Sequence, residues 1–292
     1  MIQYEQFCCD QTAPPETLTK KNCISCCERL HYYFNLTERR AAMNAYFVSD
    51  AHIGSAGSAS DCLRTREFLR FLQTVAGVGT HLFIVGDLFD FWFEYRHVIP
   101  RYPFQILSRL GALSRKGIEI HYIAGNHDFA LGNFFSRELN VMTHVDPVER
   151  KLGSKRFYIA HGDGVNPKDK GYRFIRKIVR HPLSNRLFRI LHPDLGIAFA
   201  HSLSRLSRNC RSVKDRDAIY AEYAQFRFSE GFDCVVLGHT HRPQCVEVDG
   251  KIYINTGDWM ESFTYGHFDG DRLTLRKWNT EETSLQGPQW ES

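Results

Sequence analysis

One stretch near the beginning of the chain decides the fold, Ala45-Tyr46-Phe47-Val48-Ser49-Asp50-Ala51-His52. Its first half is an apolar run with the length and composition of a short buried strand. Its second half places an aspartate and a histidine two positions apart, so on an extended segment both side chains point the same way. Asp50 and His52 can therefore reach one metal ion, although such a pair alone is weak evidence of a site.

Four later stretches resemble this one, and where a strand can be identified each follows it directly. They are Gly86-Asp87, Gly125-Asn126-His127-Asp128, His161-Gly162-Asp163 and Gly238-His239-Thr240-His241. In layered α/β folds ligands gather at the carboxyl ends of strands, where motifs far apart in sequence meet. A single Gly-Asp or His-x-Asp is usually a turn. The joint occurrence of five such motifs at successive strand ends indicates one shared site.

Strand and helix patterns alternate from residue 45 onward. Strands are predicted at 46–49, 81–85 and 118–124, and helices at 61–75 and 104–116. Two hairpin strands are predicted at 148–152 and 157–160, around Gly153-Ser154, so we expect a mixed sheet. This alternation favours an α/β layered fold whose sheet is covered by helices on both faces.

Composition sets broad limits on the molecule. A chain of 292 residues with 43% hydrophobic residues can bury a core as one domain with an insertion, or as two domains. No apolar run approaches the length of about 18 to 20 residues that a membrane-spanning helix needs. The net charge of +4 implies no particular partner by itself. Nine cysteines without zinc-site spacing are most simply explained as free thiols in a reducing cytoplasm.

Residues 1–43 differ from the rest of the chain. They contain Pro14-Pro15, polar residues and five of the cysteines, and they have no apolar segment of the kind that a secretory signal needs. We expect a disordered leader or a mis-assigned start, with Met43 as the native first residue.

The motif side chains offer carboxylate and amide oxygens together with imidazole nitrogens, and no thiolate. The predicted metal ligands are Asp50, His52, Asp87, Asn126, His161, His239 and His241. This donor set suits a divalent first-row ion such as Mn²⁺, Fe²⁺ or Zn²⁺. Two ions about 3.5 to 4 Å apart share seven ligands if one carboxylate bridges them, and Asp87 is the predicted bridge. His127, beside a predicted ligand, is placed to donate a hydrogen bond or a proton to a phosphate or its leaving group.

The combined motifs resemble those of the calcineurin-like metallophosphoesterases, over roughly residues 45 to 260. The resemblance implies a four-layer α/β/β/α sandwich with a helical cap inserted in it. It implies a first metal held by Asp50, His52, Asp87 and His241, and a second held by Asp87, Asn126, His161 and His239. The expected division is a phosphoesterase domain at 44–165 and 217–275, a cap at 166–216 and a tail at 276–292.

The predicted cap is basic and amphipathic. Lys and Arg greatly outnumber its three acidic residues, and apolar residues recur among them at helical spacing. A solvated helix face is one explanation, and nucleic-acid binding is another. The interleaved residues are mainly Leu, Ile and Val rather than base-stacking aromatics, so an anionic, acylated ligand or an anionic membrane surface is favoured and nucleic acid is not expected. The predicted substrate-binding residues are Asn126, Lys168, Lys170, Arg173, Arg176 and Arg180.

Several segments are similar to the UDP-2,3-diacylglucosamine diphosphatases of lipid A synthesis. They are Gly86-Asp87-Leu88-Phe89-Asp90-Phe91-Trp92, Lys170-x-Tyr172-Arg173 and Pro182-Leu183-x-x-Arg186-Leu187-Phe188. The resemblance implies a hydrolase that cleaves the pyrophosphate of UDP-2,3-diacylglucosamine at the α-phosphate, with Mn²⁺ favoured. The products would be UMP and 2,3-diacylglucosamine 1-phosphate.

We accordingly expect a cytoplasmic protein that associates peripherally with the cytoplasmic face of the inner membrane. One departure is that the best-known members have Arg at the position of His127, which places this chain in a His-containing branch. Two alternatives remain open. One is a general metallophosphoesterase that acts on another nucleotide, a phospholipid or a phosphoprotein, and the other is a non-catalytic membrane-surface binding protein.

Overall fold

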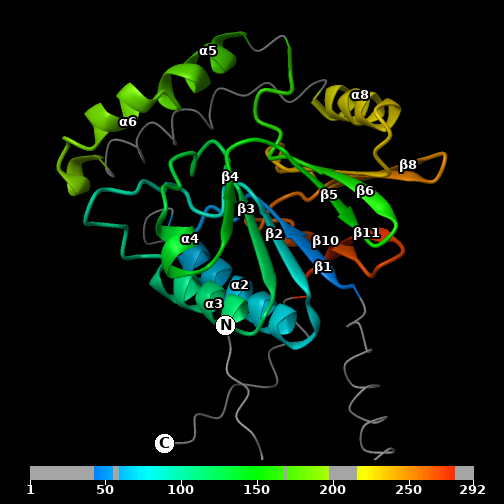
Figure 1. The fold of residues 1–292 in the computed structure, drawn as a ribbon, viewed down its shortest axis with the longest axis horizontal. Coiled ribbons are helices and arrows are strands. Elements are labelled where there is room, and N and C mark those ends of the chain that lie inside the picture. The colour runs from blue at the N-terminus through cyan, green and yellow to red at the C-terminus, as the bar shows by residue number, and fades with distance from the viewer. Residues whose placement is uncertain (1–42, 55–58, 168–169, 197–215, 280–292) are drawn as a thin grey trace, which may run out of the picture. The chain divides into compact units, whose positions relative to one another are not determined.

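The computed structural model describes residues 43–54, 59–167, 170–196 and 216–279 (Figure 1). Almost all of the predicted leader at 1–43 lies outside these residues, as do Lys168, part of the predicted cap and most of the predicted tail. Within the described residues, no helix is both long enough and apolar enough to span a membrane.

A six-stranded sheet carries the first three motifs, in the strand order β11-β10-β1-β2-β3-β4. Its strands are β1 (Ala45–Val48), β2 (His81–Val85), β3 (Glu119–Ile123), β4 (Met142–His144), β10 (Thr264–Phe268) and β11 (Leu273–Lys277). Strands β1 to β4 run parallel, whereas β10 pairs antiparallel with β1, and β11 pairs antiparallel with β10. The three strands predicted here are confirmed to within one residue at each end.

A five-stranded sheet carries the other two motifs, in the order β5-β6-β7-β9-β8. Its strands are β5 (Val148–Leu152), β6 (Lys155–Ile159), β7 (Cys234–Leu237), β8 (Gln244–Val248) and β9 (Lys251–Asn255). β6, β7 and β9 are parallel neighbours, and β5 and β8 pair antiparallel at the edges. The predicted hairpin and the predicted mixture of directions are confirmed. β6 begins two residues earlier than predicted, because Lys155 pairs with Leu152 across the turn.

Helices cover one face of each sheet. α2 (Ala59–Val78) and α3 (Phe104–Arg115) pack on the six-stranded sheet through side chains such as Phe71 and Leu110, and both predicted helices are confirmed. α8 (Arg216–Ser229) packs on the five-stranded sheet through Tyr220, Ala224 and Phe228. The expectation of one sheet with helices on both faces is wrong, because alternation along the chain does not show that the strands divide between two sheets.

The remaining faces of the two sheets share one buried cluster. It contains Phe47, Phe83 and Ile123 from the first sheet with Phe157, Val236 and Ile254 from the second. Phe47 stacks on both Phe83 and Phe157, with ring centroids 4.9 and 5.6 Å apart. Sheet-to-sheet packing of this kind holds the carboxyl ends of strands from both sheets at one edge.

Three shorter helices complete the described chain. α4 (Phe134–Glu138) precedes β4, and α5 (Lys170–Val179) and α6 (Pro182–Phe188) belong to the predicted cap. α6 begins with a proline at its first position, and the imidazole of His181 accepts a hydrogen bond from the Leu183 N–H. Figure 1 shows α5 and α6 running across the top of the view, beyond the ends of the central strands.

Candidate metal centre

The motif loops are joined to one another by backbone hydrogen bonds. The Asp50 N–H donates to the Gly86 carbonyl at 3.1 Å, and the His52 N–H donates to the Asp87 carbonyl at 3.0 Å. In the other sheet the Gly238 N–H donates to the His161 carbonyl at 3.0 Å. The two sets of loops are joined by the His239 N–H, which donates to Asp50 Oδ2 at 2.9 Å across 189 positions of sequence.

Five predicted metal ligands have a left-handed backbone. Among the described residues, Asp50, His52, Asp87, His239 and His241 have φ between 44° and 69°. Non-glycine residues rarely adopt this region, and each costs of order 1 to 3 kcal/mol unless its surroundings impose it. Strained backbone of this kind is frequent at functional sites, where it directs a side chain toward a position that an unstrained backbone would not allow.

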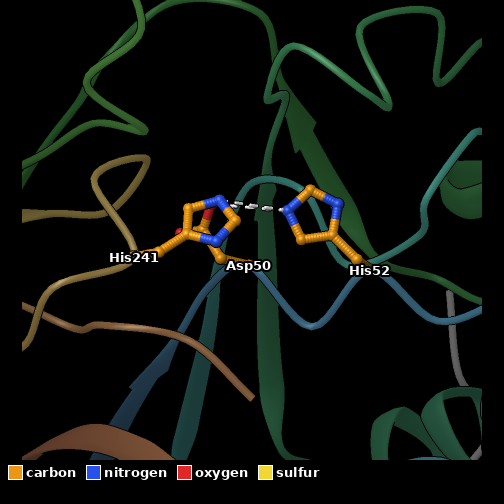
Figure 2. Close-up of side chains that lie close together, drawn as sticks. All are labelled: Asp50, His52 and His241. Carbon is orange, nitrogen blue, oxygen red and sulfur yellow. Dashed lines mark hydrogen bonds and ion pairs between the residues drawn. The ribbon is translucent and has the colours of Figure 1, made fainter. Parts of the chain in front are cut away.

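The first cluster contains Asp50, His52 and His241 (Figure 2). The two imidazoles face each other with their Nε2 atoms 3.3 Å apart, and Oδ1 of Asp50 lies 3.3 Å from His241 Nε2 and 3.8 Å from His52 Nε2. Oδ2 of Asp50 accepts hydrogen bonds from the Ser49 hydroxyl and from the His239 N–H. Oδ1 is buried and accepts no hydrogen bond from the described residues.

The second cluster contains Asp87, His161 and His239, with Asn126 beside them. His161 Nε2 lies 3.3 Å from Asp87 Oδ2, 3.2 Å from Asn126 Oδ1 and 3.2 Å from His239 Nδ1. The Nδ1–H of His161 donates to the Val85 carbonyl, so its Nε2 faces the cluster with a lone pair in the neutral ring.

Asp87 is part of the second cluster and also lies close to the first. Its Oδ2 lies 3.9 Å from His52 Nε2 in the first and 3.3 Å from His161 Nε2 in the second. Its Oδ1 is occupied by a hydrogen bond from the His127 N–H at 2.8 Å. A Cβ on Gly125 would lie 2.1 Å from that Oδ1, so only glycine lets the Asn126 loop approach the carboxylate so closely.

These residues fit two divalent ions. Atoms bound to one ion at about 2.1 Å lie about 3.0 to 3.5 Å apart around it, which matches most of the separations in both clusters. The buried Asp50 Oδ1 with no donor is a ready ligand, because a cation would supply the partner that such an atom requires. The structure thus brings together all seven predicted ligands, with Asp87 between the two groups.

The charges around the clusters favour cations. Burial opposes a charge on His161, but the carboxylates of Asp87, Asp50 and Asp163 together raise the pKa of His161 to about 10. Burial likewise opposes a charge on His52, whereas Asp50, Asp90 and Asp87 raise its pKa to about 9. The negative charge that holds protons on these rings is available to hold metal ions in their place, with release of the protons.

His127 lies beside both clusters without belonging to the predicted ligand set. Its Nδ1–H donates to the Asp90 carbonyl at 2.7 Å, and its ring meets the His52 ring edge-on at 4.5 Å. Burial lowers the pKa of His127 to about 4, and the Asp87 carboxylate opposes this only in part. Donation of a proton from Nε2 needs the charged ring, which the negative charge of a bound phosphate would favour.

Two aspartates support the ligand loops and were not among the predicted site residues. Asp128 accepts hydrogen bonds from the N–H groups of Gly125 and Leu88 and from the Tyr122 hydroxyl, which ties the second and third motifs together. Asp90 lies 3.7 Å from His52 Nδ1. Both aspartates occur in the motifs, but only the fold shows what they touch.

The predicted substrate-binding arginines divide into two groups. Arg176 and Arg180 both pair with Asp163 at 2.6 and 3.1 Å, and Arg180 also donates to the Gly125 carbonyl, so they fasten α5 to the motif loops. Arg173 is exposed on a pocket wall. Lys168 lies outside the described residues, as does the side chain of Lys170.

Two described histidines outside the motifs, His97 and His121, show the ordinary surroundings of surface and core histidines. His97 is exposed, and the buried ring of His121 bonds with Glu119 and His144 at 2.8 and 2.9 Å. Within the described chain, only the motif loops bring three or more potential metal ligands together.

Comparison with known proteins places this arrangement in a class. The profile of the calcineurin-like phosphoesterases matches residues 43–243. The chain belongs to the calcineurin-like phosphoesterase family. This family binds divalent metals, and the two clusters are candidate ligand groups for such ions.

The names of similar curated proteins describe a more specific activity than the family does. The UDP-2,3-diacylglucosamine hydrolase of Porphyromonas gingivalis is 30% identical over 253 residues, which cover 79% of this chain and 95% of the relative. The protein of the same name from Neisseria meningitidis serogroup B is 30% identical over 233 residues, covering 78% and 95%. Among solved structures, Vps29 from Entamoeba histolytica is similar with a TM-score of 0.40 and 16% identity, covering 80% of this chain and 90% of that one.

Proposed function

We propose that this protein hydrolyses the pyrophosphate of UDP-2,3-diacylglucosamine to UMP and 2,3-diacylglucosamine 1-phosphate, with two Mn²⁺ ions as its cofactors. Membership of the calcineurin-like phosphoesterases supports metal-dependent hydrolysis. The relatives named for this substrate, which the chain matches over most of its length, support the choice of substrate. Fe²⁺ and Zn²⁺ suit the same donor set. We favour Mn²⁺ because of the resemblance to the UDP-2,3-diacylglucosamine diphosphatases.

The observation that carries the substrate choice is an apolar pocket beside the metal centre. It has a volume of ≈ 110 Å³ and is lined by Phe91, Phe93, Phe129, Val179, Ser184, Asn185 and Phe188. Phe91 follows Asp90 directly, and Phe129 lies two positions after His127, so the motif loops themselves build one wall. The cap builds the other wall, since Phe188 of α6 lies 4.6 Å from the Phe93 ring. We infer that an acyl group of the substrate binds here, between the motif loops and the cap.

A larger, more polar pocket suits the nucleotide half. It has a volume of ≈ 380 Å³ and borders His161, Asp146, Arg173 and Arg176. Tyr158 and Tyr223, whose hydroxyls lie 2.8 Å apart, supply aromatic surface. Arg173 offers a cation to the phosphates, while the tyrosines offer apolar area to a base.

The outer surface of the cap supports contact with a membrane. Exposed apolar side chains on and after α5 and α6 include Phe174, Ile178, Leu183, Leu187, Ile190 and Leu195. Exposed basic residues lie among them, including Lys177, Arg186 and Arg189. This combination favours the surface of an anionic bilayer, where an acylated substrate resides. The proposed location is the cytoplasmic face of the inner membrane.

The residues divide the chemical work. When bound, two divalent ions supply an activated water and neutralise charge on the phosphate in the transition state. Asn126, at the edge of the second cluster, orients the phosphate, and His127 donates a hydrogen bond or a proton to it. The surrounding carboxylates, Asp90 and Asp128, keep the ligand loops in place.

The test is product analysis with purified protein, Mn²⁺ and the acylated sugar nucleotide. We expect equal amounts of UMP and diacylglucosamine 1-phosphate, and no product after chelation of the metal. Release of UDP instead would place the cleavage at the wrong bond. Turnover of simple phosphodiesters without turnover of the sugar nucleotide would favour a general phosphoesterase.

A further inference from the structure

A buried arginine of α2 donates hydrogen bonds to backbone carbonyls of the loop that carries Asp50 and His52. Arg64 is 6% exposed, and its Nη1 donates to the carbonyl of His52 at 2.7 Å and to the carbonyl of Ala51 at 3.1 Å. None of the five motifs contains Arg64. A buried guanidinium is costly unless its donors are used, and the two carbonyls offer it acceptors.

The other polar backbone groups of this loop are held by different elements. The N–H groups of Asp50, His52 and Ile53 donate to carbonyls of the Gly86-Asp87-Leu88 loop, at 3.0 to 3.1 Å. The carbonyl of Asp50 accepts from the Trp259 N–H, and that of Ile53 accepts from the Asp90 N–H. The carbonyls of Ala51 and His52 are left for Arg64.

Asp61, one turn earlier on α2, adds a second contact. Its Oδ1 accepts a hydrogen bond from the Gly54 N–H at 3.0 Å, at the point where the loop leaves the metal centre. The first turns of α2 therefore contact this loop at three residues: the Arg64 guanidinium donates to two of its carbonyls, and the Asp61 carboxylate accepts from the Gly54 N–H.

The loop needs such support because two of its residues are strained. Asp50 has φ 52° and His52 has φ 44°, and both side chains must point into the first cluster. Strained backbone persists only where neighbouring groups impose it. Loss of the Arg64 contacts would leave two buried carbonyls without these donors and would let His52 relax away from His241.

We propose that Arg64 is a positioning residue of the metal centre, which holds Asp50 and His52 in the geometry that binds the first ion. This inference rests on the divalent-metal centre and is independent of the lipid substrate. Partners behind metal ligands typically change metal affinity by about 10- to 100-fold when they are removed.

The experiment measures Mn²⁺ binding directly, by the electron paramagnetic resonance signal of free Mn²⁺ during titration of the metal-free full-length protein. Arg64→Met keeps the apolar stem and removes the donors, and we expect it to weaken one of two binding sites by about 10- to 100-fold. Arg64→Lys should restore part of the affinity, because an ammonium can still donate to one carbonyl. Arg66→Met is the matched control, since this exposed arginine on α2 pairs with Glu67.

Thermal unfolding separates positioning from general stability. If Arg64 positions ligands, Arg64→Met reduces the rise in Tm caused by Mn²⁺ much more than it changes the Tm of the metal-free protein. Should this variant fail to fold, Asp61→Ala serves in its place, with an expected smaller loss of affinity at the same site. Two Mn²⁺ sites with the affinities of the control, in whichever variant folds, would overturn the proposal. Absence of activity on the acylated sugar nucleotide would contradict only the proposed function.

Discussion

The metal centre and the cap are built in opposite ways. Asp50, His52, Asp87 and His161 are buried at the ends of strands, and backbone hydrogen bonds join their loops. The cap instead exposes Phe174 of α5, Leu187 of α6 and Ile190 just after α6, at 65%, 59% and 80%. On the proposed function, the reaction depends on the buried clusters, whereas the choice of substrate depends on the more exposed, apolar cap.

Asp87→Ala should have the largest effect. The variant loses the carboxylate that lies between the two clusters, so we expect it to lose bound metal and to fall to background activity. Metal content by mass spectrometry and initial rates check this. Glu247→Gln, at an exposed ion pair with Arg272, should match the wild type. Full metal content in Asp87→Ala would show that the ions do not share this residue.

His127→Ala separates catalysis from metal binding. We expect wild-type metal content with kcat lower by about 10² to 10⁴, as for loss of a general acid or a transition-state donor. His97→Ala removes an exposed histidine and should leave kcat unchanged. If His127→Ala empties the site, His127 is a ligand and its assigned role is wrong.

Phe188→Ala tests the cap without touching the metal. The variant shortens one wall of the apolar pocket, so we expect kcat/KM for the acylated sugar nucleotide to fall by about 10-fold. Turnover of bis(4-nitrophenyl) phosphate should not change, because it has no acyl chain. Ile190→Ala, at a more exposed side chain nearby, is the control. Equal losses on both substrates would mean that the cap acts on the chemistry itself.

Arg173→Ala should have a smaller effect. An exposed guanidinium contributes modestly to binding, so we expect KM for the sugar nucleotide to rise about 2- to 5-fold with metal content unchanged. Arg189→Ala, on the outer cap surface, is the matched control in detergent solution. An unchanged KM would remove Arg173 from the nucleotide pocket.

Protonation of His121 should lower the stability of the folded protein at acidic pH, and it should not affect activity at neutral pH. Burial lowers its pKa to about 4, whereas an unfolded histidine titrates near about 6.5. The unfolded chain therefore binds the extra proton between these values, and the free energy of unfolding should fall as pH falls from about 6.5 to 4. Denaturant unfolding of His121→Phe should show a shallower dependence than His97→Phe. An identical pH dependence would exclude His121 as its source.

Local patterns in the sequence predict the elements well but not their long-range partners. The strand 81–85, the hairpin from 148 and the motifs that follow strands are predictable because periodicity and motif residues are local. The pairing of β1 with β10, more than 200 positions away, leaves no such pattern. The contact of Arg64 with the His52 carbonyl and the pairing of Arg176 and Arg180 with Asp163 are not predictable either. Helical spacing shows that a helix has a basic face, but it does not show what that face contacts.

The proposed division of roles is that the metal centre determines the reaction while the cap determines the substrate. Its most direct test is the ratio of kcat/KM for UDP-2,3-diacylglucosamine to that for the deacylated sugar nucleotide, measured with Mn²⁺. We predict rapid release of UMP from the acylated substrate and none measurable from the deacylated one. Equal turnover of the two would contradict the claim, because the cap would then contribute nothing to substrate choice.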